Sequence, residues 1–193
     1  MLRFFPLQRR YLVAVILTFS LCAGCSEDLP ADTARLIRVI DGDSYFVSWR
    51  GKEEQIRAIG IDAPEGSAGA ITRRGEDKNA VETEQELLMG RLAAEHAASL
   101  LPRNGEIRLV FDPANAANDH RDRFGRILAF IYVPARNGQS ELFINEKMIE
   151  DGFAQALTRF RYDERIKDRL ISAEQRARRR DAGIWRIHPD VFE

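Results

Sequence analysis

The sequence predicts an α+β domain built around a small β-barrel. Strand-like segments come mostly before two of the three segments with helical periodicity, an order typical of α+β domains rather than of parallel doubly wound sheets. The first three strand-like segments follow one another through short turns, which predicts a meander. The 193 residues are enough for one domain of ordinary size, and closing the sheet into a barrel is the economical way to hide its strand edges.

The strands are predicted from apolar residues that alternate along the chain and are bounded by turn residues. Asp41-Gly42-Asp43 separates the first two strands. Gly51 marks a hairpin turn before the third strand, because glycine adopts the positive φ that such a turn needs. The expected strands are 36–40, 45–49, 54–61, 106–111 and 126–133.

Apolar residues at helical spacing predict three helices. The first covers 84–101, where Pro102 stops it. A short helix begins at Ile144, and Gly152 can cap its end. The stretch 65–82 is rich in glycine and charge and predicts a surface loop. The last helix carries an apolar stripe of Ile166, Leu170, Ala173 and Ala177.

The N-terminal residues have the pattern of an export signal. Residues 1–24 contain three arginines and no acid, and their apolar run is short for a membrane span and ends in small residues. With Cys25 following, the end of this run resembles a bacterial lipoprotein cleavage box, although Cys22 stands where leucine is usual. Acylation of Cys25 is the first expectation, and plain cleavage with release, or an uncleaved anchor, are the alternatives.

These observations define the expected domain organisation. We expect a signal peptide at 1–24, a tether at 25–33, one folded domain at 34–186 and a tail at 187–193. The chain has 29 basic and 30 acidic residues, and three of the basic ones lie in the signal, so the mature chain is about four charges negative. Phosphate binding must therefore come from local basic groups rather than from bulk positive charge. Two cysteines exclude a disulfide-rich scaffold.

Two clusters of charged residues can carry chemistry in the first half of the chain. Asp41-Gly42-Asp43 puts two carboxylates at a strand boundary, where hard oxygen ligands suit Ca²⁺ or Mg²⁺. The alternative is an ordinary Asp-Gly turn. In the second cluster, Arg57 is followed by Asp62 and Glu65 on either side of the rigid Pro64. Its alternative is a surface ion pair beside a proline-defined turn.

The third cluster is Asp122-Arg123-Phe124-Gly125-Arg126, directly before a predicted strand. Arginine suits phosphate oxygens because of its planar fork of donors, and the alternative is a charged hairpin end. The three clusters in this order resemble the staphylococcal nuclease-like (thermonuclease) family over residues 34–186. Asn145-Glu146, Gly152-Phe153-Ala154 and Ala182-Gly183-Ile184-Trp185 also fit. The resemblance implies an OB-fold five-stranded β-barrel with three α-helices.

The same resemblance implies a metal site. Asp43 and Asp62 would bind one Ca²⁺ through their carboxylates, and the backbone carbonyl of Ala63 would be a further ligand. Asp41 would support these ligands without binding the ion directly. The family usually has threonine at the position of Ala63, so a hydroxyl contact is lost here while the carbonyl remains.

The resemblance also implies catalytic roles. Glu65 would be the general base or would orient the attacking water. Arg57 and Arg126 would hold the scissile phosphate and stabilise the charge that develops on it. This matches the physical need, because phosphodiester hydrolysis depends on positive groups and a base near the water. Aromatic residues of the family are altered here: a tyrosine is replaced by Phe124, and Thr158 and Phe160 stand at two further aromatic positions.

We therefore expect a Ca²⁺-dependent endonuclease that cleaves DNA, RNA or both and leaves 3′-phosphate ends. It is expected to be exported, as an envelope lipoprotein on the periplasmic or outer-membrane side or as a secreted protein, and to be a monomer with no obligate protein partner. One alternative is a non-catalytic OB-fold module, anchored to the envelope, that binds nucleic acid or protein. The other is a lipid-anchored structural module.

Overall fold

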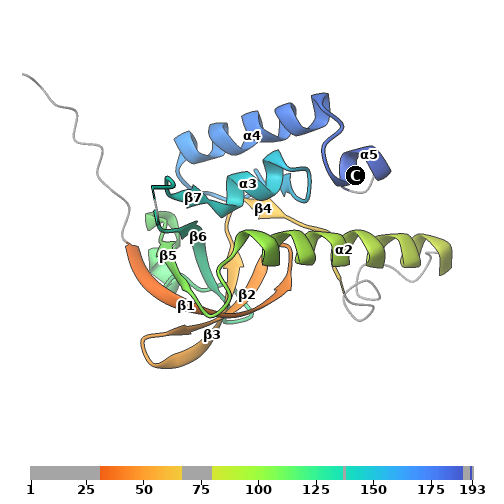
Figure 1. Ribbon diagram of the computed structural model, residues 1–193. Helices are drawn as coiled ribbons and strands as arrows, with labels where there is room; N and C mark the ends of the chain where they lie inside the picture. Colours follow the sequence, from red (N-terminus) through yellow and green to blue (C-terminus); the bar gives the residue numbers. More distant parts are fainter. Residues whose placement is uncertain (1–30, 67–79, 137, 189–191, 193) are drawn as a thin grey trace, which may run out of the picture.

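The computed structural model describes residues 31–66, 80–136, 138–188 and 192. The expected signal peptide, Cys25 and most of the expected loop 65–82 lie outside this part of the chain. In the described part, a curved β-barrel carries helices along one side and over one end (Figure 1). None of the described helices is long and apolar enough to cross a membrane.

Five strands form the barrel. β1 (Ala31–Asp41), β2 (Ser44–Trp49) and β3 (Lys52–Ala58) make the predicted antiparallel meander. β5 (Glu106–Val110) pairs with β1, and β6 (Ile127–Val133) pairs with β5. β3 and β6 then pair in parallel and close the ring. This arrangement confirms the predicted α+β class and the OB-type five-stranded barrel.

The third strand ends earlier than predicted. It leaves the barrel after Ala58, and Gly60 turns the chain with a φ of 78°. A Cβ on Gly60 would lie 2.8 Å from the side chain of Leu170, so the turn also needs glycine for space. The chain then forms β4 (Ile61–Asp62), which pairs with β8 (Gln155–Ala156) outside the barrel. The prediction of one strand over 54–61 was wrong because the chain turns at Gly60 and its next residues pair with β8, which lies far away in the sequence.

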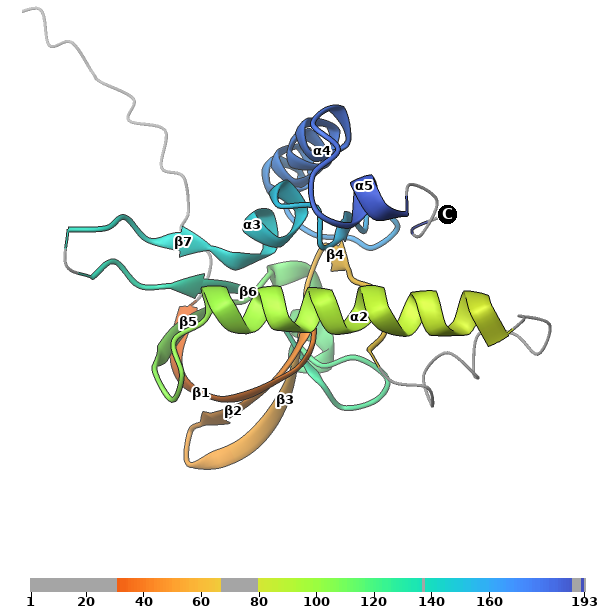
Figure 2. The same ribbon diagram turned by 45° about the vertical axis from the view of Figure 1, so that its right-hand side comes forward.

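Figures 1 and 2 show how the helices are arranged around the barrel. α2 (Ala80–Leu100) runs along the barrel wall, and α3 (Ile144–Glu150) and α4 (Glu164–Arg179) pack on each other over its end. These are the three predicted helices. Two short helices were not predicted: the 3₁₀ helix η1 (Pro113–Asn118) and α5 (Ile184–Ile187).

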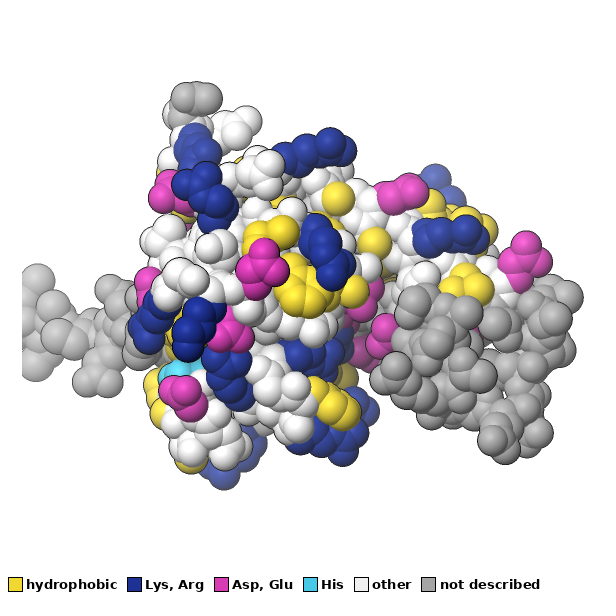
Figure 3. All heavy atoms as spheres, turned by 90° about the horizontal axis from the view of Figure 1, so that it is seen from below, with side chains coloured by type: hydrophobic (Ala, Val, Ile, Leu, Met, Phe, Trp, Pro, Cys, Tyr) yellow, Lys and Arg dark blue, Asp and Glu magenta, His cyan; other side chains and the backbone are white. Residues whose placement is uncertain are grey.

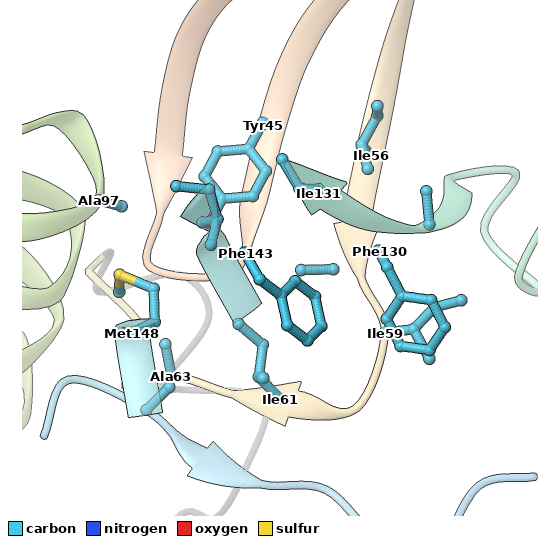
Figure 4. Packing of buried hydrophobic residues seen from close by; sticks show 14 of the residues in the cluster. Tyr45, Ile56, Ile59, Ile61, Ala63, Ala97, Phe130, Ile131, Phe143 and Met148 are labelled. Atoms are coloured by element: carbon cyan, nitrogen blue, oxygen red, sulfur yellow. The ribbon is translucent and has the colours of Figure 1, made fainter. Parts of the chain in front are cut away.

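The buried core joins the barrel to the helices. Its largest members include Tyr45, Ile56 and Phe130 from three different strands, together with Met148 from α3. Figure 4 shows these side chains converging on the space between the strands and α3, with Ala63 beside Met148. Ala63 is therefore both a residue of the predicted site and a member of the core. Because the site rests directly on this core, core packing determines where the site residues lie.

One buried amide ties the elements together. Asn145, at the start of α3, is fully buried. Its Oδ1 accepts from the backbone N–H of Ile131 at 2.9 Å, and its Nδ2 donates to the backbone carbonyl of Ile59 at 2.7 Å. The first partner lies in β6 and the second in the turn that leads to β4. Asn145 thus satisfies two backbone groups that the barrel itself leaves unpaired.

Asn145→Ala should lower the free energy of unfolding by about 3 kcal/mol, because both backbone partners would stay buried without a hydrogen bond. Urea denaturation followed by circular dichroism measures this. Asn118→Ala is the matched control, since Asn118 is exposed, and it should change stability by no more than about 0.5 kcal/mol. Equal effects of the two substitutions would contradict the role given to Asn145.

Candidate active site

Arg57 joins carboxylates from two separate parts of the chain. Its guanidinium Nη1 contacts Oδ1 of Asp43, and its Nη2 donates to Oδ1 of Asp62 at 2.8 Å. The Asp43 side chain is 2% exposed, and those of Arg57 and Asp62 are 15% and 18% exposed. The first two of the predicted clusters therefore meet at one guanidinium.

Asp43 is held from several sides. Its Oδ1 accepts from the hydroxyl of Ser44 at 3.1 Å, and its Oδ2 accepts from the backbone N–H of Ala63 at 2.8 Å. The turn before it is anchored as well, because the buried Tyr45 hydroxyl donates to the carbonyl of Gly42 at 2.8 Å. Burial raises the pKa of Tyr45, so that its hydroxyl remains a donor. The carboxylate thus has one defined orientation.

Asp41 supports this turn. Its Oδ1 accepts from the backbone N–H of Asp43 at 3.3 Å. Burial raises the pKa of Asp41, and the positive charges of Arg57 and Arg126 act in the opposite direction. Arg126 therefore lies within electrostatic range of the Asp41 carboxyl. Burial also lowers the pKa of Arg57, while Asp62 and Asp41 favour its charged form.

Small residues allow α2 to approach both acidic segments closely. A Cβ on Gly42 would lie 2.6 Å from the Cβ of Ala63 and 3.0 Å from that of Ala93 in α2. Gly42 lies in the turn between β1 and β2 without a positive φ, so the structure needs glycine there for space. A Cβ on Gly90 would lie 2.2 Å from the backbone carbonyl of Glu65. The backbone of Glu65 is therefore pressed against α2.

Glu65 follows Asp62 and Ala63 on the segment after β4. Its side chain is half-buried, and Pro64 before it is buried. The contact with Gly90 fixes the backbone of this segment against α2, three residues after Asp62.

The third predicted cluster forms a turn closed by Asp122. Oδ1 of Asp122 accepts from the backbone N–H groups of Phe124 and Arg126 at 2.9 and 3.0 Å, and its Oδ2 pairs with Nε of Arg126 at 2.7 Å. Gly125 has a φ of 81° within the turn. Asp122 thus orients Arg126, and Phe124 stands 68% exposed beside it.

A second ion pair anchors this turn to the barrel. Both guanidinium nitrogens Nη1 and Nη2 of Arg121 donate to the carboxylate of Glu54 in β3 at 2.9 Å. The hydrogen bond from Arg121 lowers the pKa of Glu54, and the same bond raises the pKa of Arg121. Sequence analysis missed this pair, since 67 residues separate its partners.

An open groove of about 770 Å³ lies beside these clusters. Both Arg57 and Arg126 line it, so it reaches the residues predicted to hold a phosphate. Sequence analysis did not identify η1 as a wall of this groove, and in the segment 157–161 it singled out Thr158 and Phe160 but neither arginine. The sequence of this segment does contain a signal for nucleic-acid binding, an aromatic residue between two arginines. The charged and amide side chains lining the groove are Arg57, Asn115, Asn118, Arg121, Asp122, Arg123, Arg126, Arg159 and Arg161.

The acidic pair fits a hard cation. Among the described residues, no three acidic, histidine or cysteine side chains gather closely enough to hold a metal ion by themselves. Asp43 and Asp62 nevertheless converge on one cationic group and present hard oxygen atoms. Ca²⁺ combines carboxylates with backbone carbonyls and water, so these two residues with the Ala63 carbonyl are a suitable donor set. A bound cation would share both carboxylates with Arg57.

The fold and this cluster define a class of protein: a closed OB-type barrel that carries an Arg–Asp cluster beside a basic groove. Comparison with known families agrees, since the sequence profile described as Staphylococcal nuclease homologue matches residues 55–187. The chain therefore belongs to the staphylococcal nuclease homologue family.

Individual relatives point to the same group. The chain is 29% identical to a thermonuclease of Staphylococcus hyicus over 153 residues, which cover 79% of this chain and 75% of that protein. It is 27% identical to endonuclease YncB of Bacillus subtilis over 152 residues, covering 78% of this chain and 60% of that protein. An uncharacterized protein of Methanocaldococcus jannaschii is 26% identical over 159 residues, covering 78% and 70%. These matches support a nuclease-like function.

Gly90→Ala tests the contact between α2 and the segment that carries Glu65. On an open helix surface the change would stabilise the protein by about 1 kcal/mol. Here the new Cβ would collide with the Glu65 backbone, so we expect a net loss of about 1–3 kcal/mol in the free energy of unfolding.

Urea denaturation measures this loss. Gly66→Ala is the control on the other side of the same contact, because its Cβ would meet nothing closer than 3.4 Å. A Gly90→Ala protein as stable as the original would show that the segment carrying Glu65 can move away from α2 with no loss in the free energy of unfolding.

Proposed function

We propose that this chain is a Ca²⁺-dependent endonuclease that hydrolyses phosphodiester bonds in DNA, RNA or both. The observation that carries the proposal is the contact of Arg57 with Asp43 and Asp62 at the edge of a groove that Arg126 also lines. Family membership supports the nuclease part of it. The ion and the 3′-phosphate products follow from the family resemblance and are part of the proposal.

The residues divide into two sets by charge. Asp43, Asp62 and the carbonyl of Ala63 would hold Ca²⁺, with Asp41 steadying the turn that carries Asp43. The ion would polarise a phosphate oxygen when it is bound. Placing Asp43 on a buried turn gives its carboxylate one orientation, so little conformational freedom would be lost when a cation binds.

The positive set acts on the phosphate. Arg57 and Arg126 would each donate to its non-bridging oxygens, and their charges oppose the negative charge that grows as water attacks phosphorus. Glu65 would accept the proton of that water or orient it. The bond between phosphorus and the 5′ oxygen breaks, so the phosphate stays on the 3′ side and the 5′ oxygen takes up a proton.

Four positions distinguish this site from the usual family pattern. Ala63 keeps the carbonyl but has no hydroxyl. Phe124 has no phenolic hydroxyl, yet it is exposed near the guanidiniums of Arg123 and Arg126, whose centres lie 4.7 and 5.5 Å from its ring. Thr158 and Phe160 are both exposed. We propose that these differences alter substrate preference and leave the hydrolytic residues unchanged.

Cleavage of single-stranded DNA should require Ca²⁺ and stop in a chelator. Glu65→Gln should abolish it while leaving the fold intact, because it removes the base without changing the size of the side chain. Gel separation of labelled products measures this. Binding without cleavage in the unmodified protein would favour the non-catalytic alternative instead.

Arg126→Ala isolates the phosphate-binding role better than Arg57→Ala, because loss of Arg57 would leave the buried Asp43 without its cationic partner. A single donor aimed at the developing charge is worth about 3 kcal/mol, so turnover should fall about 100-fold. Arg103→Ala, which removes an exposed arginine outside the groove, is the matched control and should keep normal turnover.

We further propose that residues 1–24 direct export and that Cys25 is acylated, with release after cleavage as the alternative. The sequence pattern alone supports this. Labelling with palmitate should fail in Cys25→Ser and persist in Cys22→Ser, measured by fluorography of the purified protein. Label that persists in Cys25→Ser would rule out this residue as the site.

A further inference from the structure

The arginines that line the groove fall into two groups. Arg57, Arg121 and Arg126 each pair with a carboxylate. Arg123, Arg159 and Arg161 form no ion pair with any described residue, and Asp122 is the only acidic side chain among the described groove residues. The positive charge that the groove offers to a ligand therefore comes largely from the second group.

Two members of this group stand on a short segment that is tied down at both ends. The N–H of Leu157 donates to the carbonyl of Gly60 at 2.8 Å, and the hydroxyl of Tyr162 donates to the carbonyl of Leu157 at 3.2 Å. Burial raises the pKa of Tyr162 to about 12, so its hydroxyl remains a donor at neutral pH. Arg159, Phe160 and Arg161 project from this segment and are exposed.

The same segment is attached to η1. The buried carboxylate of Asp112 accepts from the N–H of Ala114, at the start of η1, at 2.8 Å and from the N–H of Asp163 at 2.7 Å. One carboxylate thus holds together two of the segments that line the groove. Asn115 and Asn118, one 3₁₀ turn apart on η1, line it as well.

Arginines without an acidic partner on an anchored segment keep all their donors available to an anionic ligand, and the anchoring fixes where those donors start. Phe160 stands between the two arginines, 54% exposed, with the guanidinium of Arg159 5.2 Å from its ring centre. Alternating cations and an exposed ring are the features that bind single-stranded nucleic acid, where phosphates pair with arginines and bases stack.

We propose that Arg159 and Arg161 form a second phosphate-binding subsite, which holds the substrate strand beyond the phosphate that is cleaved. This inference rests on the proposed nuclease function. The groove connects the subsite to Arg57 and Arg126, so one strand can contact both places. The ligand is a single-stranded polynucleotide longer than a dinucleotide.

Binding of a labelled oligonucleotide of about eight nucleotides, measured by fluorescence anisotropy in a chelator, tests the subsite apart from cleavage. In the full chain, Arg159→Gln with Arg161→Gln should weaken binding about tenfold at low salt. The slope of log affinity against log salt should become shallower by about 1.4, since each phosphate contact contributes about 0.7 for a single strand. Arg159→Lys with Arg161→Lys should restore most of the slope, because it keeps the charge.

Arg103→Gln with Arg179→Gln is the matched control. Both are exposed arginines outside the groove that form no ion pair with described residues, so the pair changes the net charge equally. The control should keep the original affinity and salt slope. A control that weakens binding as much as the groove pair would show a general charge effect and overturn the subsite.

The outcomes separate this inference from the function on which it rests. With Ca²⁺, the preference for a long strand over a dinucleotide, measured as the ratio of kcat/KM values, should fall in the Arg159 and Arg161 double variant. If the original protein cleaves DNA and the double variant keeps its affinity, salt slope and length preference, the subsite is wrong and the nuclease stands. If the original protein neither binds nor cleaves nucleic acid, both proposals are wrong.

Discussion

Arg57 makes the contact around which the site is arranged. Asp43 comes from the turn between β1 and β2, and Asp62 comes from β4, so two negative charges converge at the barrel edge. Without a cation between them they would repel each other, and the buried Asp43 would also lack compensation for its lost hydration. The guanidinium of Arg57 supplies the charge and the paired donors that both carboxylates need. Its role in the fold and its proposed role at a phosphate therefore depend on the same geometry.

Close packing of backbone on backbone supports this contact. α2 lies against the Asp43 turn through Ala93 and against the Glu65 segment through Gly90, and larger side chains would force these segments apart. The parallel pairing of β3 with β6 places Arg57 opposite Leu128, directly after the turn that carries Arg126. Barrel closure and helix packing together bring the separate clusters to one edge.

The distribution of charge explains how a chain with a net charge of −1 can present a basic surface. Acids and arginines pair with each other over much of the described chain, and the groove brings three arginines without such partners onto one surface. Figure 3 shows a face on which many basic side chains lie among exposed hydrophobic ones and scattered acidic ones. The proposed affinity for a polyanion would thus be a property of one surface, which the total charge does not reveal.

The sequence by itself determined the approximate positions of the five barrel strands, the three main helices and the hairpin at Gly51, because periodicity and turn residues act through local backbone preferences. It also indicated which charged clusters belong to the candidate site, but only as separate segments along the chain. Only the tertiary structure decided that Arg57 touches both Asp43 and Asp62, that the third strand ends at Ala58 before the turn at Gly60, and that Arg159 and Arg161 share a groove with Arg126. Distances between residues far apart in sequence depend on barrel closure and on the packing of α4, and no local pattern encodes them.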